Sequence, residues 1–168
     1  MNQDYKDLSS AFHAHGVKYL VVGGYAVILH AQPRFTKNID FFIRPDPDNA
    51  RATYAVLADF GAPLQGIRPE DFTDCNSFFR FGRDPRGIDI LPDIPGVDFD
   101  AAWERRVEAV VDPASGLKGS FISADNLVAA KLAAGRPQDI ADVDAIRKAA
   151  ASEVSCPAEN PEPDGPSR

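Results

Sequence analysis

The sequence has few cysteines, no long apolar run and less positive than negative charge. The two cysteines, Cys75 and Cys156, have no partner at metal-ligand spacing, which argues against a disulfide framework and a zinc site. No run approaches the roughly 18 apolar residues of a membrane span, and residues 1–4 lack the basic-then-apolar order of a secretory signal. We therefore expect no membrane association and a cytoplasmic location.

Positive charge is the second shortage. The 168 residues include 18 Lys and Arg against 25 Asp and Glu, which gives a net charge of −7 and a pI near 4.9. Proteins that follow a nucleic-acid backbone depend on clustered Lys and Arg. The composition thus argues against an extended nucleic-acid surface, although it leaves open an RNA end presented to a cleft.

What is present is a composition ordinary for a globular protein, with 44% hydrophobic and 26% charged residues. The apolar pattern predicts one domain over residues 1–150. Residues 151–168 are rich in Pro, Glu and Ser and have no periodic apolar face. That composition predicts a disordered tail.

Strand and helix patterns alternate along the domain and predict an α+β fold. The clearest helix covers 47–60, with Asp46 as N-cap, Pro47 in the first turn and Gly61 after the end. Other helices are predicted at 4–15, 25–31, 99–106, 124–134 and 137–149, and strands at 17–24, 38–43, 77–82, 87–94, 108–113 and 117–123. We expect a mixed sheet covered by helices, with a C-terminal helical pair.

Polar side chains interrupt two of the predicted strands. Asn38 and Asp40 share one face of their strand because side chains alternate, and Asp89 breaks an apolar pattern in the same way. An unpaired buried carboxylate costs several kcal/mol, so these oxygens are expected to meet a cation, a donor set or a ligand. Three oxygen ligands on neighbouring strands indicate a divalent metal, and magnesium prefers such ligands.

Local ion pairs are the alternative explanation for these acids. Asp40 has Arg34 and Lys37 nearby in the sequence, and Asp89 has Arg80 and Arg86 across a predicted hairpin.

Gly23 and Gly24 stand between a predicted strand and a predicted helix. Glycines there allow the backbone amides of a helix N-terminus to approach phosphate groups. A simple tight turn is the alternative.

These motifs occur together and in a fixed order. The segments VVGGYAVILH (21–30), RFTKNIDFFI (34–43) and GIDIL (87–91) resemble the nucleotidyltransferases of the polymerase-β-like superfamily. More narrowly, PRGIDILPDIPGVDFDAAW (85–103) and LVAAKLAAGRPQDIADVDAI (127–146) are similar to small prokaryotic nucleotidyltransferases akin to the AbiEii-type toxins of toxin–antitoxin systems. The resemblance implies that two magnesium ions support nucleotidyl transfer from an NTP to an acceptor.

The resemblance also implies roles for single residues. It assigns metal binding to Asn38, Asp40 and Asp89, with Asp89 at the metal that faces the acceptor. Gly23 and Gly24 would contact phosphates.

Lys131 matches a family lysine expected near the triphosphate, and we expect it to act in catalysis with the two aspartates. Thr36, Arg136 and Asp139 match positions expected at the nucleotide. Structural alternatives remain for these three: Thr36 would hold its loop by a hydrogen bond to the backbone, and Arg136 would pair with Asp139 at a helix start.

One position departs from the family pattern. Position 38 is Asn where the pattern has Asp, so one negative charge is missing. Two hypotheses follow. The first is a magnesium-dependent nucleotidyltransferase that modifies a protein, an RNA end or a small molecule. The second is a catalytically weak nucleotide-binding or interaction module of a toxin–antitoxin pair, with a cognate antitoxin or toxin as partner. A dinucleotide-binding dehydrogenase is set aside, because no G-x-G-x-x-G follows the first strand.

Overall fold

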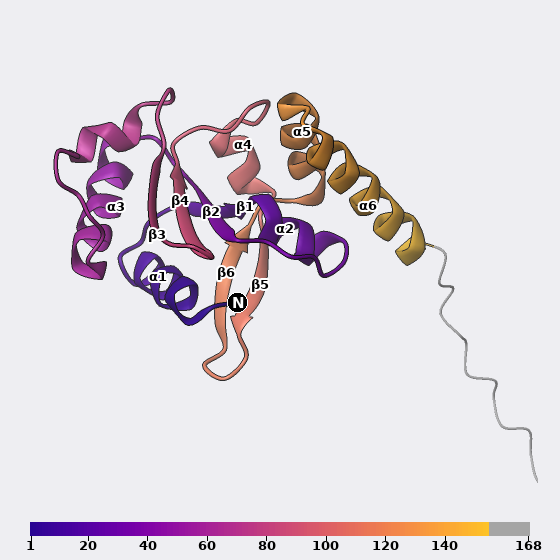
Figure 1. The fold of residues 1–168 in the computed structure, drawn as a ribbon, viewed down its shortest axis with the longest axis horizontal. Helices are drawn as coiled ribbons and strands as arrows, with labels where there is room; N and C mark the ends of the chain where they lie inside the picture. The colour runs from indigo at the N-terminus through magenta and orange to yellow at the C-terminus, as the bar shows by residue number, and fades with distance from the viewer. Residues whose placement is uncertain (155–168) are drawn as a thin grey trace, which may run out of the picture.

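The computed structural model describes residues 1–154 and contains a mixed six-stranded sheet with helices around it (Figure 1). The strands lie in the order β3-β4-β2-β1-β6-β5. They are β1 (Tyr19–Val22), β2 (Asn38–Ile43), β3 (Phe79–Arg83), β4 (Arg86–Leu91), β5 (Val107–Asp112) and β6 (Leu117–Phe121). The helices are α1 (Gln3–Ala14), α2 (Gly23–His30), α3 (Pro47–Phe60), α4 (Phe99–Glu104), α5 (Ala124–Ala134), α6 (Pro137–Val154) and the 3-10 helix η1 (Pro69–Thr73). The predicted α+β class, mixed sheet and C-terminal helical pair are confirmed.

Strand β2 separates the hydrophobic core from a cavity. On its core face, the ring of Phe41 contacts Phe12 of α1, with ring centroids 5.4 Å apart. On the other face, Phe42 packs against Phe99 of α4 at 5.0 Å. Asp40, two residues earlier on that second face, borders the cavity instead. The alternation of β2 thus puts Asp40 on the face that α4 covers at Phe42, but at a position that borders the cavity.

The neighbours of β2 determine which residues meet at the cavity. β2 pairs antiparallel with β1 and parallel with β4. In the parallel pair Asp40 lies opposite Asp89, and Asn38 lies opposite Gly87. Val22, the last residue of β1, lies opposite Asp40 on the other side. The register therefore brings the two acids and the start of α2 together.

Helix α3 begins and ends as predicted. The side chain of Asp46 accepts hydrogen bonds from the amides of Asp48 and Asn49, and Gly61 ends the helix with a φ of 86°. This left-handed conformation favours glycine.

Three local features differ from the prediction. The last helix continues from the predicted end at 149 to Val154, so residues 151–154 of the predicted tail are helical; alanines at 149–151 favour helix, and Pro157 is the first breaker. The remainder of that tail, with Cys156, lies outside the described residues. Gly23 and Gly24 form the first turn of α2 rather than a separate turn. Helix η1 was not predicted. None of the helices in residues 1–154 has both the length and the apolar content needed to cross a membrane.

Candidate functional site

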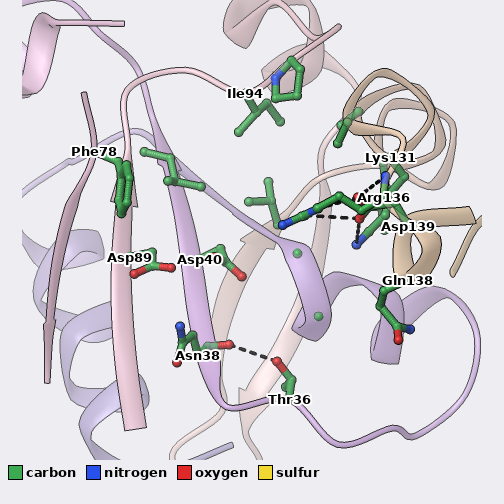
Figure 2. A pocket seen from close by; sticks show the side chains of 18 of the residues that line it. Thr36, Asn38, Asp40, Phe78, Asp89, Ile94, Lys131, Arg136, Gln138 and Asp139 are labelled. Atoms are coloured by element: carbon green, nitrogen blue, oxygen red, sulfur yellow. Dashed lines mark hydrogen bonds and ion pairs between the residues drawn. The ribbon is translucent and has the colours of Figure 1, made fainter. Parts of the chain in front are cut away.

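A cavity of about 590 Å³ lies where the ends of β1, β2 and β4 meet α2, α5 and α6 (Figure 2). Every residue that the sequence assigns to the site lines it. These residues are Gly23, Gly24, Thr36, Asn38, Asp40, Asp89, Lys131, Arg136 and Asp139. The cavity has two sides of different character, and we call the β2 and β4 side with Asn38, Asp40 and Asp89 the strand wall.

The strand wall carries two carboxylates in close proximity. The pKa of Asp40 is raised from 3.8 to about 7, mainly by burial and then by the negative charge of Asp89, while Lys131 and Arg80 act in the opposite direction. Asp89 itself is only 3% exposed. The positive charge available inside the chain is therefore not sufficient to keep Asp40 fully ionised at neutral pH.

Asp89 has a partner that the sequence offered as an alternative. Arg80 of β3 donates two hydrogen bonds to its carboxylate, at 2.6 and 2.7 Å. Asp40, by contrast, forms no salt bridge with any residue in 1–154. Each oxygen of Asp89 accepts one bond from Arg80 and retains further lone pairs, so Asp89 can still bind a cation.

Three glycines lie directly against polar side chains of the site. In each case an added Cβ would overlap the neighbouring side chain. The pairs are Gly23 with Asp40, Gly24 with Thr36, and Gly87 with Asn38. Gly23 also has a φ of 61°, in the left-handed region that favours glycine.

The N-terminus of α2 has free hydrogen-bonding capacity. Its N-cap, Val22, makes no side-chain hydrogen bond to the first turn. Amides of a first helical turn have no partner within the helix, and their dipoles favour anions. The glycines of this turn thus provide a place for phosphate beside Asp40.

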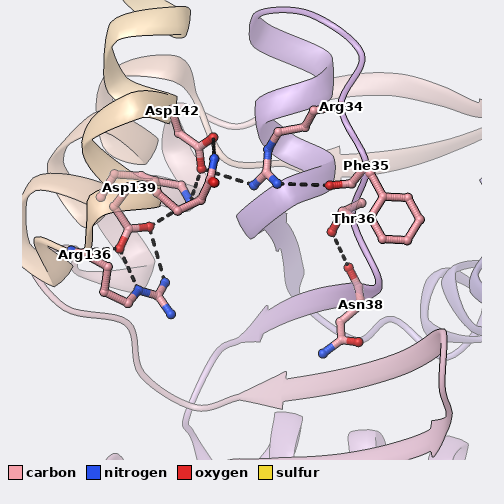
Figure 3. Close-up of polar contacts among 9 residues, drawn as sticks. Arg34, Phe35, Thr36, Asn38, Arg136, Asp139 and Asp142 are labelled. Carbon is pink, nitrogen blue, oxygen red and sulfur yellow. Dashed lines mark hydrogen bonds and ion pairs between the residues drawn. The ribbon is translucent and has the colours of Figure 1, made fainter.

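The opposite side of the cavity, which we call the helical wall, is a connected set of ion pairs from α5, α6 and the segment before β2 (Figure 3). Lys131 donates a hydrogen bond to Asp139 at 3.0 Å and forms an ion pair with Asp142 at 2.8 Å. Arg136 donates to Asp139 at 2.7 Å, and Arg34 to Asp142 at 3.1 Å. Three cations share two carboxylates, which leaves an excess of positive charge.

The helical wall changes the interpretation of Lys131. Its ammonium group is held between Asp139 and Asp142 and its residue is buried at 7% exposure, so in this arrangement its charge is paired within the protein. Arg136, in contrast, is 76% exposed and borders the cavity. The predicted alternative pairing of Arg136 with Asp139 is present, yet Arg136 retains donors for a ligand.

Burial acts to raise the pKa of Asp139, but the hydrogen bonds and charges of Arg136 and Lys131 outweigh it, and the pKa is lowered overall. Asp139 therefore stays ionised at neutral pH, whereas Asp40 on the strand wall has a raised pKa.

Arg34, which the sequence offers as a local partner for Asp40, pairs with Asp142 instead. Its side chain is partly buried against Asp142 and lines the cavity, and its Nε is buried without a hydrogen-bond partner among the described residues. Asp142 and Gly87 were not recognised as part of the site. The only sequence signal for Asp142 is its spacing three residues after Asp139, which puts both acids on one helix face.

Thr36 has the local role that was offered as an alternative. Its hydroxyl donates to the carbonyl of Asn38 at 3.2 Å and so holds the entry to β2. It also lines the cavity beside Gly24.

The donor set of the strand wall fits magnesium. Two carboxylates and the amide oxygen of Asn38 are the hard oxygen ligands that this ion prefers, and a divalent cation would relieve the repulsion that raises the pKa of Asp40. Residues 1–154 contain no cluster of three or more His, Cys, Asp or Glu side chains suited to a metal. The strand wall is therefore a pair of acids supplemented by an amide.

Comparison with known families gives one result that covers the domain. The family described as "Nucleotidyltransferase of unknown function (DUF6036)" matches residues 3–154, which includes both walls of the cavity. No curated protein matches the chain. The protein therefore belongs to this nucleotidyltransferase family.

Proposed function

We propose that the protein is a magnesium-dependent nucleotidyltransferase that moves a nucleotide from an NTP to an acceptor, either a protein, an RNA end or a small molecule. The observation that carries the proposal is the in-register pair Asp40 and Asp89, whose charge is incompletely neutralised, beside the free N-terminus of α2. The family membership supports the general class of reaction.

The triphosphate would bind between the two walls. Backbone amides at Gly23 and Gly24 would donate to phosphate oxygens, and Arg34 and Arg136 would add positive charge from the helical wall.

Asn38, Asp40 and Asp89 would hold the magnesium ions, and we propose two, one of them arriving with the triphosphate. Bound magnesium would neutralise phosphate charge and lower the pKa of the acceptor hydroxyl. Asp89 would orient the acceptor and help to remove its proton. The acceptor oxygen forms a bond to the α-phosphorus, the bond to pyrophosphate breaks, and pyrophosphate leaves.

A second candidate function is supported by Asn38. One formal charge fewer at the metal site and the Arg80 fork on Asp89 both weaken the attraction for a second ion. The protein would then bind nucleotide with little turnover, as one member of a toxin–antitoxin pair.

The test is magnesium-dependent pyrophosphate release with each of the four NTPs. Asp40→Ala removes a metal ligand, and Asp144→Ala is the matched control, because Asp144 is an exposed acid of α6 outside the cavity lining. Release that requires magnesium, persists in Asp144→Ala and vanishes in Asp40→Ala supports the enzyme. Magnesium-dependent NTP binding without release, unchanged by Asn38→Asp, supports the second candidate.

A further inference from the structure

One large aromatic side chain of the cavity has no role in metal or phosphate binding. Phe78 precedes β3, lines the cavity and is 60% exposed. Exposing a phenylalanine to water to this extent forgoes the free energy that burial would supply. Phe35 is also exposed, at 75%, but it does not line the cavity. Phe78 is thus an aromatic surface available to a ligand in the cavity.

The Phe78 ring contacts Arg80, a neighbour on β3. The guanidinium carbon of Arg80 lies 5.4 Å from the ring centroid, within the range of a cation–π contact. Arg80 is itself held by the two hydrogen bonds to the buried carboxylate of Asp89. The ring is therefore coupled to the strand wall rather than free on a surface loop.

Phe78 lies away from the cations of the helical wall. Figure 2 shows Phe78 and Asp89 on the side away from Lys131 and Arg136, with Ile94 across the opening. Leu91, two residues after Asp89 on β4, also lines the cavity, as do Ile94 and Pro95. The nearest cation, Arg80, is already engaged by Asp89. This end suits a planar apolar ring better than a phosphate group.

We infer that the Phe78 end of the cavity is a nucleobase subsite, in which a base stacks on the Phe78 ring close to Asp89. The inference rests on the proposed function, which places the triphosphate between the two walls, at Gly23, Gly24, Arg34 and Arg136. The base belongs either to the NTP or to a nucleic-acid acceptor, because both present the same planar ring. Stacking on an aromatic side chain strengthens binding about 5- to 150-fold per base.

The test compares ligands with and without a base. Affinities for ATP, inorganic triphosphate and a short single-stranded oligoadenylate RNA are measured by calorimetry with magnesium present. The variants are Phe78→Ala and Phe78→Trp, and Phe35→Ala is the matched control, an exposed phenylalanine outside the cavity lining. Because Phe78 is largely exposed, Phe78→Ala should fold, and unchanged triphosphate affinity verifies this.

Selective loss of ATP affinity in Phe78→Ala, with recovery in Phe78→Trp and no change in Phe35→Ala, supports the subsite and assigns it to the NTP base. Loss of RNA affinity alone assigns it to the acceptor base. If Phe78→Ala binds ATP and RNA as wild type does, the subsite is wrong and the proposed function stands. If the wild-type protein binds none of the three ligands, both are wrong.

Discussion

On the helical wall of the cavity, Asp139 and Asp142 are shared by Lys131, Arg34 and Arg136, whereas on the strand wall Arg80 pairs with Asp89 alone and Asp40 has no salt bridge within residues 1–154. The same residue types thus lead to opposite results. Asp139 has a lowered pKa, and Asp40 has a pKa raised to about 7.

The difference separates structure from ligand binding. The helical wall pairs both of its carboxylates with cations and joins α5, α6 and the segment before β2 into one unit. The strand wall keeps a deficit of positive charge that a bound cation can remove. Substitutions on the strand wall should therefore reduce activity, whereas substitutions on the helical wall should reduce stability.

The largest effect is expected from removing the unpaired acid. Asp40→Ala should reduce nucleotidyl transfer on the order of a thousandfold or more, because the lost ligand stabilises charge in the transition state. The variant should remain folded, since Asp40 makes no salt bridge within residues 1–154. Steady-state rates and circular dichroism check both parts. A variant with wild-type rates would remove Asp40 from the mechanism.

The next largest effect concerns the stability of the helical wall. Lys131→Met should lower the free energy of unfolding by about 3–5 kcal/mol, because it removes the one buried cation that contacts both buried carboxylates. Lys148→Met, at an exposed position of α6, serves as control and should change it by less than about 0.5 kcal/mol. Urea denaturation measures both. Equal effects of the two substitutions would contradict a structural role for Lys131.

A smaller effect is expected from restoring charge to the strand wall. Asn38→Asp should raise turnover about tenfold if the protein is an enzyme limited by metal occupancy. The measurement is turnover as a function of magnesium concentration, where the variant should need less magnesium. No turnover in either protein would favour the nucleotide-binding module.

The smallest effect is a pH dependence of stability without metal. Native Asp40 keeps its proton up to a pKa of about 7, whereas the reference value is 3.8. Between these values the native state binds more protons than the unfolded state, so this contribution to stability falls as pH rises from about 4 to about 7. In a chelator, Asp40→Asn should therefore melt a few degrees above wild type at pH 8 and close to it at pH 4.

Thermal melts of Asp144→Asn provide the control for this pH effect, since that exposed acid should show no such divergence. A difference between wild type and Asp40→Asn that does not vary with pH would contradict the raised pKa.

Local features of the fold were predictable from the sequence because local chemistry determines them. The capping residues Asp46 and Gly61 define helix α3, and the alternation in β2 correctly puts Asn38 and Asp40 on one face. The predicted end of α6 at residue 149 was wrong. It was placed from the polar composition of the residues that follow, and the helix-favouring alanines at 149–151 were not considered.

Contacts between distant segments could not be predicted in this way. The register of β2 with β4, which sets Asp40 opposite Asp89, depends on tertiary packing. The choice of Arg80 as the partner of Asp89 follows from the β3 and β4 register, and the sequence left Arg86 equally possible. The contact of Arg34 with Asp142 joins residues that no local pattern connects.

The most direct test of the account is metal binding to the nucleotide-free protein, measured by manganese electron paramagnetic resonance at neutral pH. Wild type and the exposed-acid control Asp144→Asn should bind Mn²⁺ with the same affinity, and Asp40→Asn should bind at least about tenfold more weakly, because one of two carboxylates is lost. Equal Mn²⁺ affinity of wild type and Asp40→Asn would contradict the claim that the charge deficit of the strand wall is a metal site.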